Sequence, residues 1–269
     1  MFKFNRRIGL VVAGAILLGG MFVWLFSRPH TNDTWNDLEL AGVLRVGIDA
    51  SYPPFEILDE SGQIVGFDVD FANELGRRLD LDVEFVNIAY DGLYDAMLAG
   101  RVDVLISALA DQPQATGKAL FTLPYFNAGD TLVLRVDSDI SSMEGMAGKV
   151  LAVEYGSGGD VEARKWQRRL ANLEVMRLSD PATALDAVLS GQADAALVDG
   201  IAARIGIGQH PELAWAGHVN DTLFAIATPS ESEELRKRLN KLIQELLKDD
   251  TISRLMTTWF GPQRDAILH

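Results

Sequence analysis

Short apolar runs alternate along the chain with amphipathic segments of helical period, and this alternation predicts an α/β protein. The first apolar run, residues 43–48, is rich in β-branched residues and predicts a buried strand. Residues 68–79 then place Phe71, Leu75 and Leu79 at four-residue steps, which is the spacing of a helix with one apolar face. Such alternation is typical of sheets that are covered by helices.

The same pattern predicts the other elements. Further strands are expected at residues 83–86, 101–106, 131–136, 150–153, 174–177 and 222–228. Further helices are expected at residues 93–99, 160–170, from 181 onward, 231–248 and 251–260. We expect Asp68 to cap the helix over 68–79, and Ser179-Asp180-Pro181 to begin another, because Asp favours the N-cap position and Pro the first turn.

One segment occurs twice in similar form. Residues 95–106 read DAMLAGRVDVLI and residues 186–197 read DAVLSGQADAAL, with five of the twelve positions identical. Each consists of a helix end, a glycine stop and an apolar strand. Two such units imply two similar lobes. The alternative is that any junction between a helix and a buried strand uses the same residues.

The N-terminal segment predicts where the rest of the chain resides. Residues 8–26 are 19 uncharged positions that follow three basic residues, and they just reach across a bilayer. No small-x-small cleavage site follows, so we favour an uncleaved membrane anchor over a cleaved signal within residues 1–27. The positive-inside rule then places the remainder outside the cytoplasm. Residues 28–39 are polar and are expected to be a tether.

Charge and cysteine content exclude several classes of function. The formal net charge is −14, and no acidic residue occurs before residue 33. A domain this acidic is a poor partner for nucleic acid or anionic lipid. The absence of cysteine excludes disulfides, thiol catalysis and a lipid-modified N-terminal cysteine.

Candidate binding residues lie where predicted strands end, which is where ligands bind in open α/β sheets. Asp49 and Tyr52 follow the first strand, although an acid there can also cap a turn and an aromatic can simply pack. Residues 156–160, Gly-Ser-Gly-Gly-Asp, follow a strand and begin a helix, so their amides can hold an anion. This loop lacks the Gly-Lys-Ser/Thr ending of a P-loop.

Four motifs carry a family resemblance. Residues 42–56 match G-x-L-x-V-G-x-D-x-x-Y-P-P-F-E, and residues 66–70 match G-F-D-x-D. An F-T-L-P-Y block at 121–125 and a W-F-G ending at 259–261 match as well. The chain resembles the extracellular solute-binding proteins of family 3, the polar amino acid receptors of ABC importers, over residues 40–262.

The resemblance implies a fold and a role. The fold is a two-lobed α/β architecture of the type II periplasmic binding protein kind, with two crossover strands that join the lobes. The first lobe would comprise residues 40–127 plus 223–269, and the second residues 128–222. The implied role is capture of a small polar solute, amino acid-like or a cationic amine, for an ABC transporter permease, without a cofactor, at an extracytoplasmic site tethered by residues 8–26.

The resemblance also implies a set of ligand-binding residues. In the family, acids bind the ligand's amino group, aromatic side chains cover it, and a strand-end loop and a glycine loop line the pocket. An acid, Glu154, stands where some relatives carry a ligand-binding lysine. The corresponding residues here are Asp49, Tyr52, Tyr90, Ser107, Ala108, Leu109, Glu154, Ser157, Gly158 and Asp199.

One departure from the family changes the expected ligand. The family's S-x-x-T-x-T-x-x-R loop ends in an arginine that clamps the ligand carboxylate, and here that position is Ala115, while the first threonine is Ala110. A carboxylate without a counter-ion is costly to bury. We therefore expect a cationic or neutral ligand, such as an amine, a polyamine-like or a quaternary ammonium compound. The alternatives are that Arg101 or Arg204 supplies the charge, or that ligand binding has been lost.

Enzymatic readings find little support in the sequence. The four histidines have no metal-ligand spacing, and no nucleophile elbow occurs. A dehydratase resembling cyclohexadienyl dehydratase, with Glu154 as general acid, would still need a carboxylate clamp. A membrane-tethered ligand sensor is the other alternative to a transport receptor.

Overall fold

The computed structural model describes residues 34–110 and 118–263. The expected anchor, residues 8–26, lies outside these residues. Within the described part of the chain, no helix is both long and apolar enough to cross a bilayer.

The first five-stranded sheet is mixed. Its strands stand in the order β5 (Asp82–Asn87), β1 (Val43–Ile48), β6 (Val104–Leu105), β13 (Leu223–Pro229) and β7 (Ala119–Asn127). Strand β1 pairs in parallel with β5 and β6, whereas β13 runs antiparallel to β6 and β7. β7 contains a proline, which an edge strand tolerates because its outer side needs no ladder hydrogen bond.

The second sheet repeats this layout. Its order is β10 (Glu174–Leu178), β9 (Val150–Glu154), β11 (Ala195–Val198), β8 (Thr131–Arg135) and β12 (Leu213–His218). β9 is parallel to β10 and β11, and β8 is antiparallel to β11 and β12. The strands of the two similar sequence segments, β6 and β11, thus take the same third place, so the repeat marks equivalent structural units.

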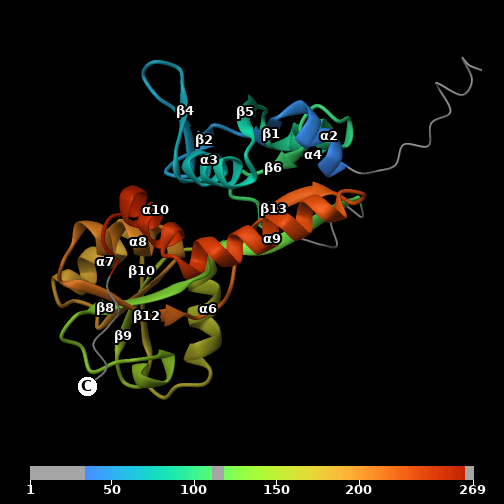
Figure 1. Ribbon diagram of the computed structural model, residues 1–269. Coiled ribbons are helices and arrows are strands. Elements are labelled where there is room, and N and C mark those ends of the chain that lie inside the picture. The colour runs from blue at the N-terminus through green and yellow to red at the C-terminus, as the bar shows by residue number, and fades with distance from the viewer. Residues whose placement is uncertain (1–33, 111–117, 264–269) are drawn as a thin grey trace, which may run out of the picture.

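Helices pack on both sheets (Figure 1). Their bounds are α2 Thr34–Ala41, α3 Phe67–Leu79, α4 Leu93–Leu98, α6 Gly158–Gln167, α7 Pro181–Leu189, α8 Gly200–Gln209, α9 Glu233–Lys248 and α10 Thr251–Phe260. Short elements are β2 Ser51–Tyr52, β3 Glu56–Leu58, β4 Ile64–Val65, η1 Tyr90–Gly92 and η2 Met143–Met146. Strands β2, β3 and β4 form a small sheet of their own.

The structure differs from the sequence expectation in the tether and at the start of α3. Residues 34–39 of the expected tether belong to α2, because Trp35 and Leu38 insert into the main core at 5% and 4% exposure. Asp68 does not cap α3, since the N-cap is Gly66 and no side chain bonds there. The Asp68 carboxylate instead accepts hydrogen bonds from residues distant in the sequence.

Two crossover segments connect the two sheets, one after β7 and one before β13 (Figure 1). They remain paired where they leave the first sheet, since Ala128 N donates to Thr222 O at 2.8 Å. A side chain on Gly129 would place its Cβ 2.0 Å from Asn220 O, so glycine is required for this close approach. The crossovers therefore form one connection between the two sheets.

Candidate functional site

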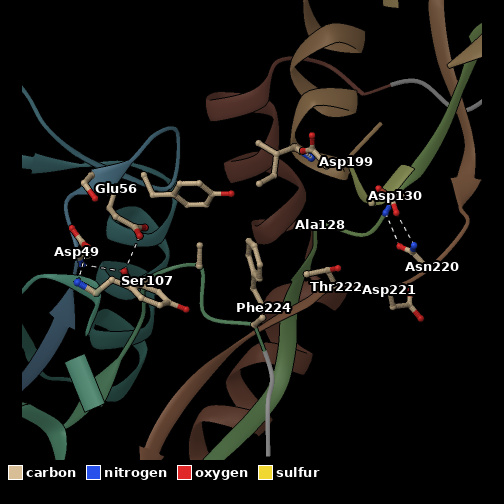
Figure 2. Close-up of a pocket in the computed structure, with 17 residues that line it drawn as sticks. Asp49, Glu56, Ser107, Ala128, Asp130, Asp199, Asn220, Asp221, Thr222 and Phe224 are labelled. Atoms are coloured by element: carbon tan, nitrogen blue, oxygen red, sulfur yellow. Dashed lines mark hydrogen bonds between the residues drawn. The ribbon is translucent and has the colours of Figure 1, made fainter. Parts of the chain in front are cut away.

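A cavity of about 850 Å³ lies between the two sheets and receives residues from both. Figure 2 shows Asp49, Glu56 and Ser107 on one side of it, Asp130, Asp199 and Asn220 on the other, and Phe224 between them. The lining residues are Asp49, Ser51, Tyr52, Glu56, Tyr90, Ser107, Ala108, Ala110, Ala128, Asp130, Gly158, Asp199, Ile201, Asn220, Asp221, Thr222 and Phe224.

The wall on the side of the first sheet is built at the C-terminal ends of β1 and β6. Asp49 N donates to Ser107 Oγ at 3.0 Å, and Asp49 Oδ2 accepts from Tyr90 N at 2.8 Å. Ser107 Oγ then donates to Glu56 Oε1 at 2.8 Å. These bonds fix an acid beside two aromatics, Tyr52 and Tyr90, which are 45% and 54% exposed and so available to a ligand.

Glu56 lines this wall, and its carboxyl group interacts electrostatically with that of the fully buried Asp68. Burial, followed by the Asp68 charge, raises the pKa of Glu56 to about 10, and burial raises the pKa of Asp68 to about 6. Among the described residues, Glu56 Oε2 and Asp68 Oδ1 are buried without another hydrogen-bond partner, so a proton on Glu56 satisfies both. At neutral pH the pair therefore carries one negative charge.

Asp68 also shapes the pocket loop. Its Oδ2 accepts from Ala108 N at 2.6 Å and from Tyr125 Oη at 3.0 Å. Ala108 adopts a φ of 44°, a left-handed conformation that is uncommon for a residue with a Cβ. The hydrogen bond to Asp68 holds the loop in this conformation and turns it along the cavity.

Two acids form the wall on the side of the second sheet. Asp199 is the N-cap of α8, where Oδ1 accepts from Ile201 N at 3.0 Å and Ala202 N at 2.9 Å. Both bonds use one oxygen, so Oδ2 can accept from a ligand. Asp130 follows the first crossover and is 8% exposed, and burial raises its pKa while the Asn220 amide opposes the rise.

Several hydrogen-bonding groups of the glycine loop, residues 156–160, are used within the loop itself. Ser157 caps α6 by accepting from Asp160 N at 3.1 Å, and its hydroxyl donates to Glu154 O at 2.8 Å. Gly156 N donates to the fully buried Asp160, whose carboxylate also pairs with Arg164 and with Arg177 at 2.8 Å. The amide groups of the loop that the sequence indicated as an anion site are thus partly used in folding the loop itself.

Seven of the ten residues expected from the sequence line the cavity, and three do not. Leu109 is 1% exposed and packs in the core around Met97. Glu154 ends β9 without reaching the cavity, and Ser157 points into its own loop. A contribution of these three to ligand binding stays a prediction.

Sequence reasoning missed several lining residues. Glu56 lies inside the Y-P-P-F-E block, which the sequence analysis singled out, but nothing in that block indicated that Glu56 lines the cavity. Asp130, Asn220 and Thr222 come from the two crossovers, and no local pattern marks them. They meet only because the crossovers lie side by side.

The cavity carries no basic residue in the described part of the chain. Arg204 is 7% exposed, and its guanidinium lies 5.1 Å from the Phe126 ring centre and 4.8 Å from that of Trp215. Arg101 does not line the cavity either. Ala115 lies outside the described residues, and the sequence from 111 to 117, which surrounds it, contains no Lys, Arg or His.

The family model of the bacterial extracellular solute-binding proteins, family 3, matches residues 44–262. The chain belongs to this family. It is therefore an extracytoplasmic solute-binding protein, and its two sheets with a cavity between them have the family's type II architecture. The resemblance seen in the motifs is confirmed over nearly the same residues.

Individual relatives cover almost the whole chain. A probable amino-acid ABC transporter-binding protein of Haemophilus influenzae is 28% identical over 258 residues, which are 94% of this chain and 97% of that protein. An ancestral cationic amino acid solute-binding protein is 29% identical with a TM-score of 0.62, covering 84% of this chain and 99% of that one. An ancestral cyclohexadienyl dehydratase is 26% identical with a TM-score of 0.73, covering 84% and 96%.

Proposed function

We propose that this protein is the substrate-binding receptor of an ABC importer and captures a small cationic solute that lacks a carboxylate. The observation that carries the proposal is the cavity lining, in which Asp49, Asp130, Asp199 and Asp221 gather without any basic residue among the described ones. Tyr52 and Tyr90 supply exposed aromatic faces. A cation against such a face gains about 0.5–2 kcal/mol.

The receptor works by closure of two lobes around the solute. The first lobe comprises residues 40–127 plus 223–269 and the second residues 128–222, each with one of the five-stranded sheets. The crossovers between them are the hinge. The segment 8–26 tethers the receptor to the outer face of the cytoplasmic membrane, close to the permease it serves.

The receptor performs no chemistry. A dehydratase for a cyclic carboxylate would have to neutralise that carboxylate in the cavity, and no described lining residue is basic. Glu154, the general acid considered from the sequence, does not line the cavity. The likeness to an ancestral dehydratase is thus explained by the shared fold.

The proposal is tested by calorimetric titration of the full chain in detergent. We expect binding of amines without a carboxylate and no binding of ordinary α-amino acids. Asp49→Asn should weaken amine binding by about tenfold or more, since a charged hydrogen bond contributes about 1.5–3 kcal/mol.

The matched control is Glu234→Gln, which removes an equal charge from the exposed face of α9 and should leave binding unchanged. Tight binding of α-amino acids alone would overturn the solute class and leave the receptor role standing. A lack of binding in both panels would count against the receptor role itself.

A further inference from the structure

Asp130 is held in a fixed position at the edge of the cavity. Its backbone N donates to Asn220 Oδ1 at 2.8 Å, and Asn220 Nδ2 donates to Asp130 Oδ2 at 2.7 Å. The side chain is 8% exposed. Both crossovers therefore hold this carboxylate where it stands, and it cannot turn freely toward solvent.

The Asp130 carboxylate rests against the first residue of α6. A Cβ built on Gly158 would lie 3.0 Å from Asp130 Oδ2 and 3.2 Å from Oδ1. The N-terminus of a helix carries a partial positive charge and favours an anion. In this protein the anion that occupies the cavity side of the helix end is a side chain of the protein itself.

A ligand carboxylate is excluded from this place for two reasons. It would have to displace Asp130 from its two bonds to Asn220, and it would meet a second negative charge at close range. The neighbouring Asp199 adds to the repulsion, since both acids line the cavity and, after burial, the Asp199 charge also raises the pKa of Asp130. The same two acids attract a cationic group, so this end of the cavity is suited to an ammonium or guanidinium group.

Acids thus stand at both ends of one cavity. Asp49 is on the side of the first sheet, Asp130 and Asp199 are on the side of the second, and the apolar ring of Phe224 lies between them (Figure 2). This arrangement matches a hydrocarbon chain with a positive charge at each end.

Building on the proposed function, we propose that Asp130 is the residue that determines ligand selectivity. It takes the place of a ligand carboxylate at the start of α6 and binds the second cationic group of an aliphatic diamine. The solute is then a dication without a carboxylate.

The first test compares three ligands on the full wild-type chain by calorimetry. 1,5-Diaminopentane has two ammonium groups, lysine is the same chain with a carboxylate added, and 1-aminopentane has one ammonium group. We expect the diamine to bind at least about tenfold more tightly than either of the others. Equal or tighter binding of lysine overturns this inference but leaves the receptor role intact, whereas no binding of any probe overturns both.

The second test asks whether a substitution of Asp130 shifts the ligand preference from the diamine to lysine. Asp130→Asn should weaken diamine binding by about tenfold or more and strengthen lysine binding, because the carboxylate is removed from the start of α6. Asp130→Ser should give the same exchange with a smaller side chain. A thermal unfolding transition close to that of the wild type shows that each variant is folded.

The matched control is Asp221→Asn. This variant removes an equal charge from the cavity, but it leaves Asp130 against Gly158. We expect it to weaken diamine binding less and to give no gain for lysine. If Asp221→Asn and Asp130→Asn change both affinities alike, net charge alone sets the preference and the specific role of Asp130 is wrong.

Discussion

Two carboxyl groups support the binding surface, Glu56 in the cavity wall and the buried Asp68, and no basic residue of the described chain lines the cavity beside them. Asp68 accepts hydrogen bonds from Ala108 N and Tyr125 Oη, and its other oxygen is the acceptor available to a proton on Glu56. Glu56 in turn accepts from Ser107, which bonds Asp49. A chain of polar contacts thus runs from the buried Asp68 through Glu56 and Ser107 to the backbone amide of Asp49, which lines the cavity.

We predict that Glu56→Gln stabilises the protein at pH 8 and has little effect at pH 4. Burial and Asp68 raise the pKa of Glu56 from 4.5 to about 10, so the folded state keeps a proton that the unfolded state loses. The contribution of Glu56 to the free energy of unfolding is therefore fully present below pH 4.5 and is lost as the pH rises towards 10. Gln donates and accepts in the same places without this cost. Thermal unfolding at both pH values measures the effect, with a rise of about 3 °C or more expected at pH 8.

Asp68→Asn provides the contrast, because it is the same chemical change on the other partner. The NH2 group of the asparagine would replace one acceptor oxygen and face a donor, either Glu56 or the pair Ala108 N and Tyr125 Oη. A buried donor without an acceptor costs about 1–3 kcal/mol. This variant should be destabilised at both pH values. Equal stability of the two variants would show that the proton does not reside on Glu56.

Individual roles could be predicted from the sequence only where the partner is close in the chain. Asp180 follows the expectation, since it caps α7 by accepting from Thr183 N at 2.8 Å. Asp68 does not, because Ala108 and Tyr125 lie 40 and 57 positions away and offer better donors than its own helix. Asp130 was missed for the same reason.

At the scale of elements, the C-terminal helix α10 packs against both lobes, in addition to the connection that the two crossovers make. It packs on α3 and α9 in the first lobe and on α8 in the second. The contact with α8 is made by backbone, since a Cβ on Gly208 would lie 2.1 Å from Phe260 O. The Phe260 ring packs against those of Phe55, Phe67 and Phe126, with ring centres 5.5, 5.8 and 5.3 Å away.

Gly208→Ala should destabilise the protein. Alanine favours a helix by about 1 kcal/mol over glycine, but the added methyl group must push α10 away from α8. Overpacking of this kind costs about 1–3 kcal/mol, and loss of a close backbone contact places the cost at the upper end. Denaturant unfolding measures the difference.

Gly145→Ala is the matched control, because its nearest neighbour would be Ile140 Cγ2 at an ordinary 3.4 Å. It should change the free energy of unfolding little. If the two variants behave alike, then α10 yields easily and does not connect the lobes.

Most elements could be predicted from periodicity, because their hydrophobic pattern is local. Helix α9 buries Leu235, Leu239, Leu242 and Leu246 on one side, as their spacing requires. Strand β6 is shorter than expected, two residues instead of six, because only Val104 and Leu105 pair with neighbours. Helix α2 was not expected, since its two buried residues stand among polar ones.

At the scale of the whole molecule, we predict that a bound amine brings the two lobes closer together. The chain has no cysteine, so two introduced cysteines can be labelled specifically. Asp91→Cys lies next to Tyr90 in the first lobe, and Tyr155→Cys lies beside the glycine loop in the second, where the native side chain is 72% exposed. Energy transfer between fluorophores at these positions should increase on titration with 1,5-diaminopentane.

A pair within one lobe, Asp91→Cys with Glu60→Cys, is the control and should show no change. An interlobe signal that stays constant while calorimetry reports binding would contradict closure about the crossovers.

The arrangement of lobes itself could be predicted from the sequence only through the family motifs. Periodicity indicates two units but not how they face each other.

The two crossovers are joined by amide side chains as well as by backbone. Asn127 Nδ2 donates to Asp221 Oδ1 at 2.8 Å, and Asn220 Oδ1 accepts from Asp130 N at 2.8 Å. The residues that we propose to set solute selectivity therefore lie in the segments that we propose as the hinge. We therefore expect a substitution there that changes the bound solute to change the rate at which the lobes open as well. Tyr52 and Tyr90 line the cavity but lie outside the crossovers. Substitutions at these two residues are therefore expected to change ligand preference without changing lobe opening.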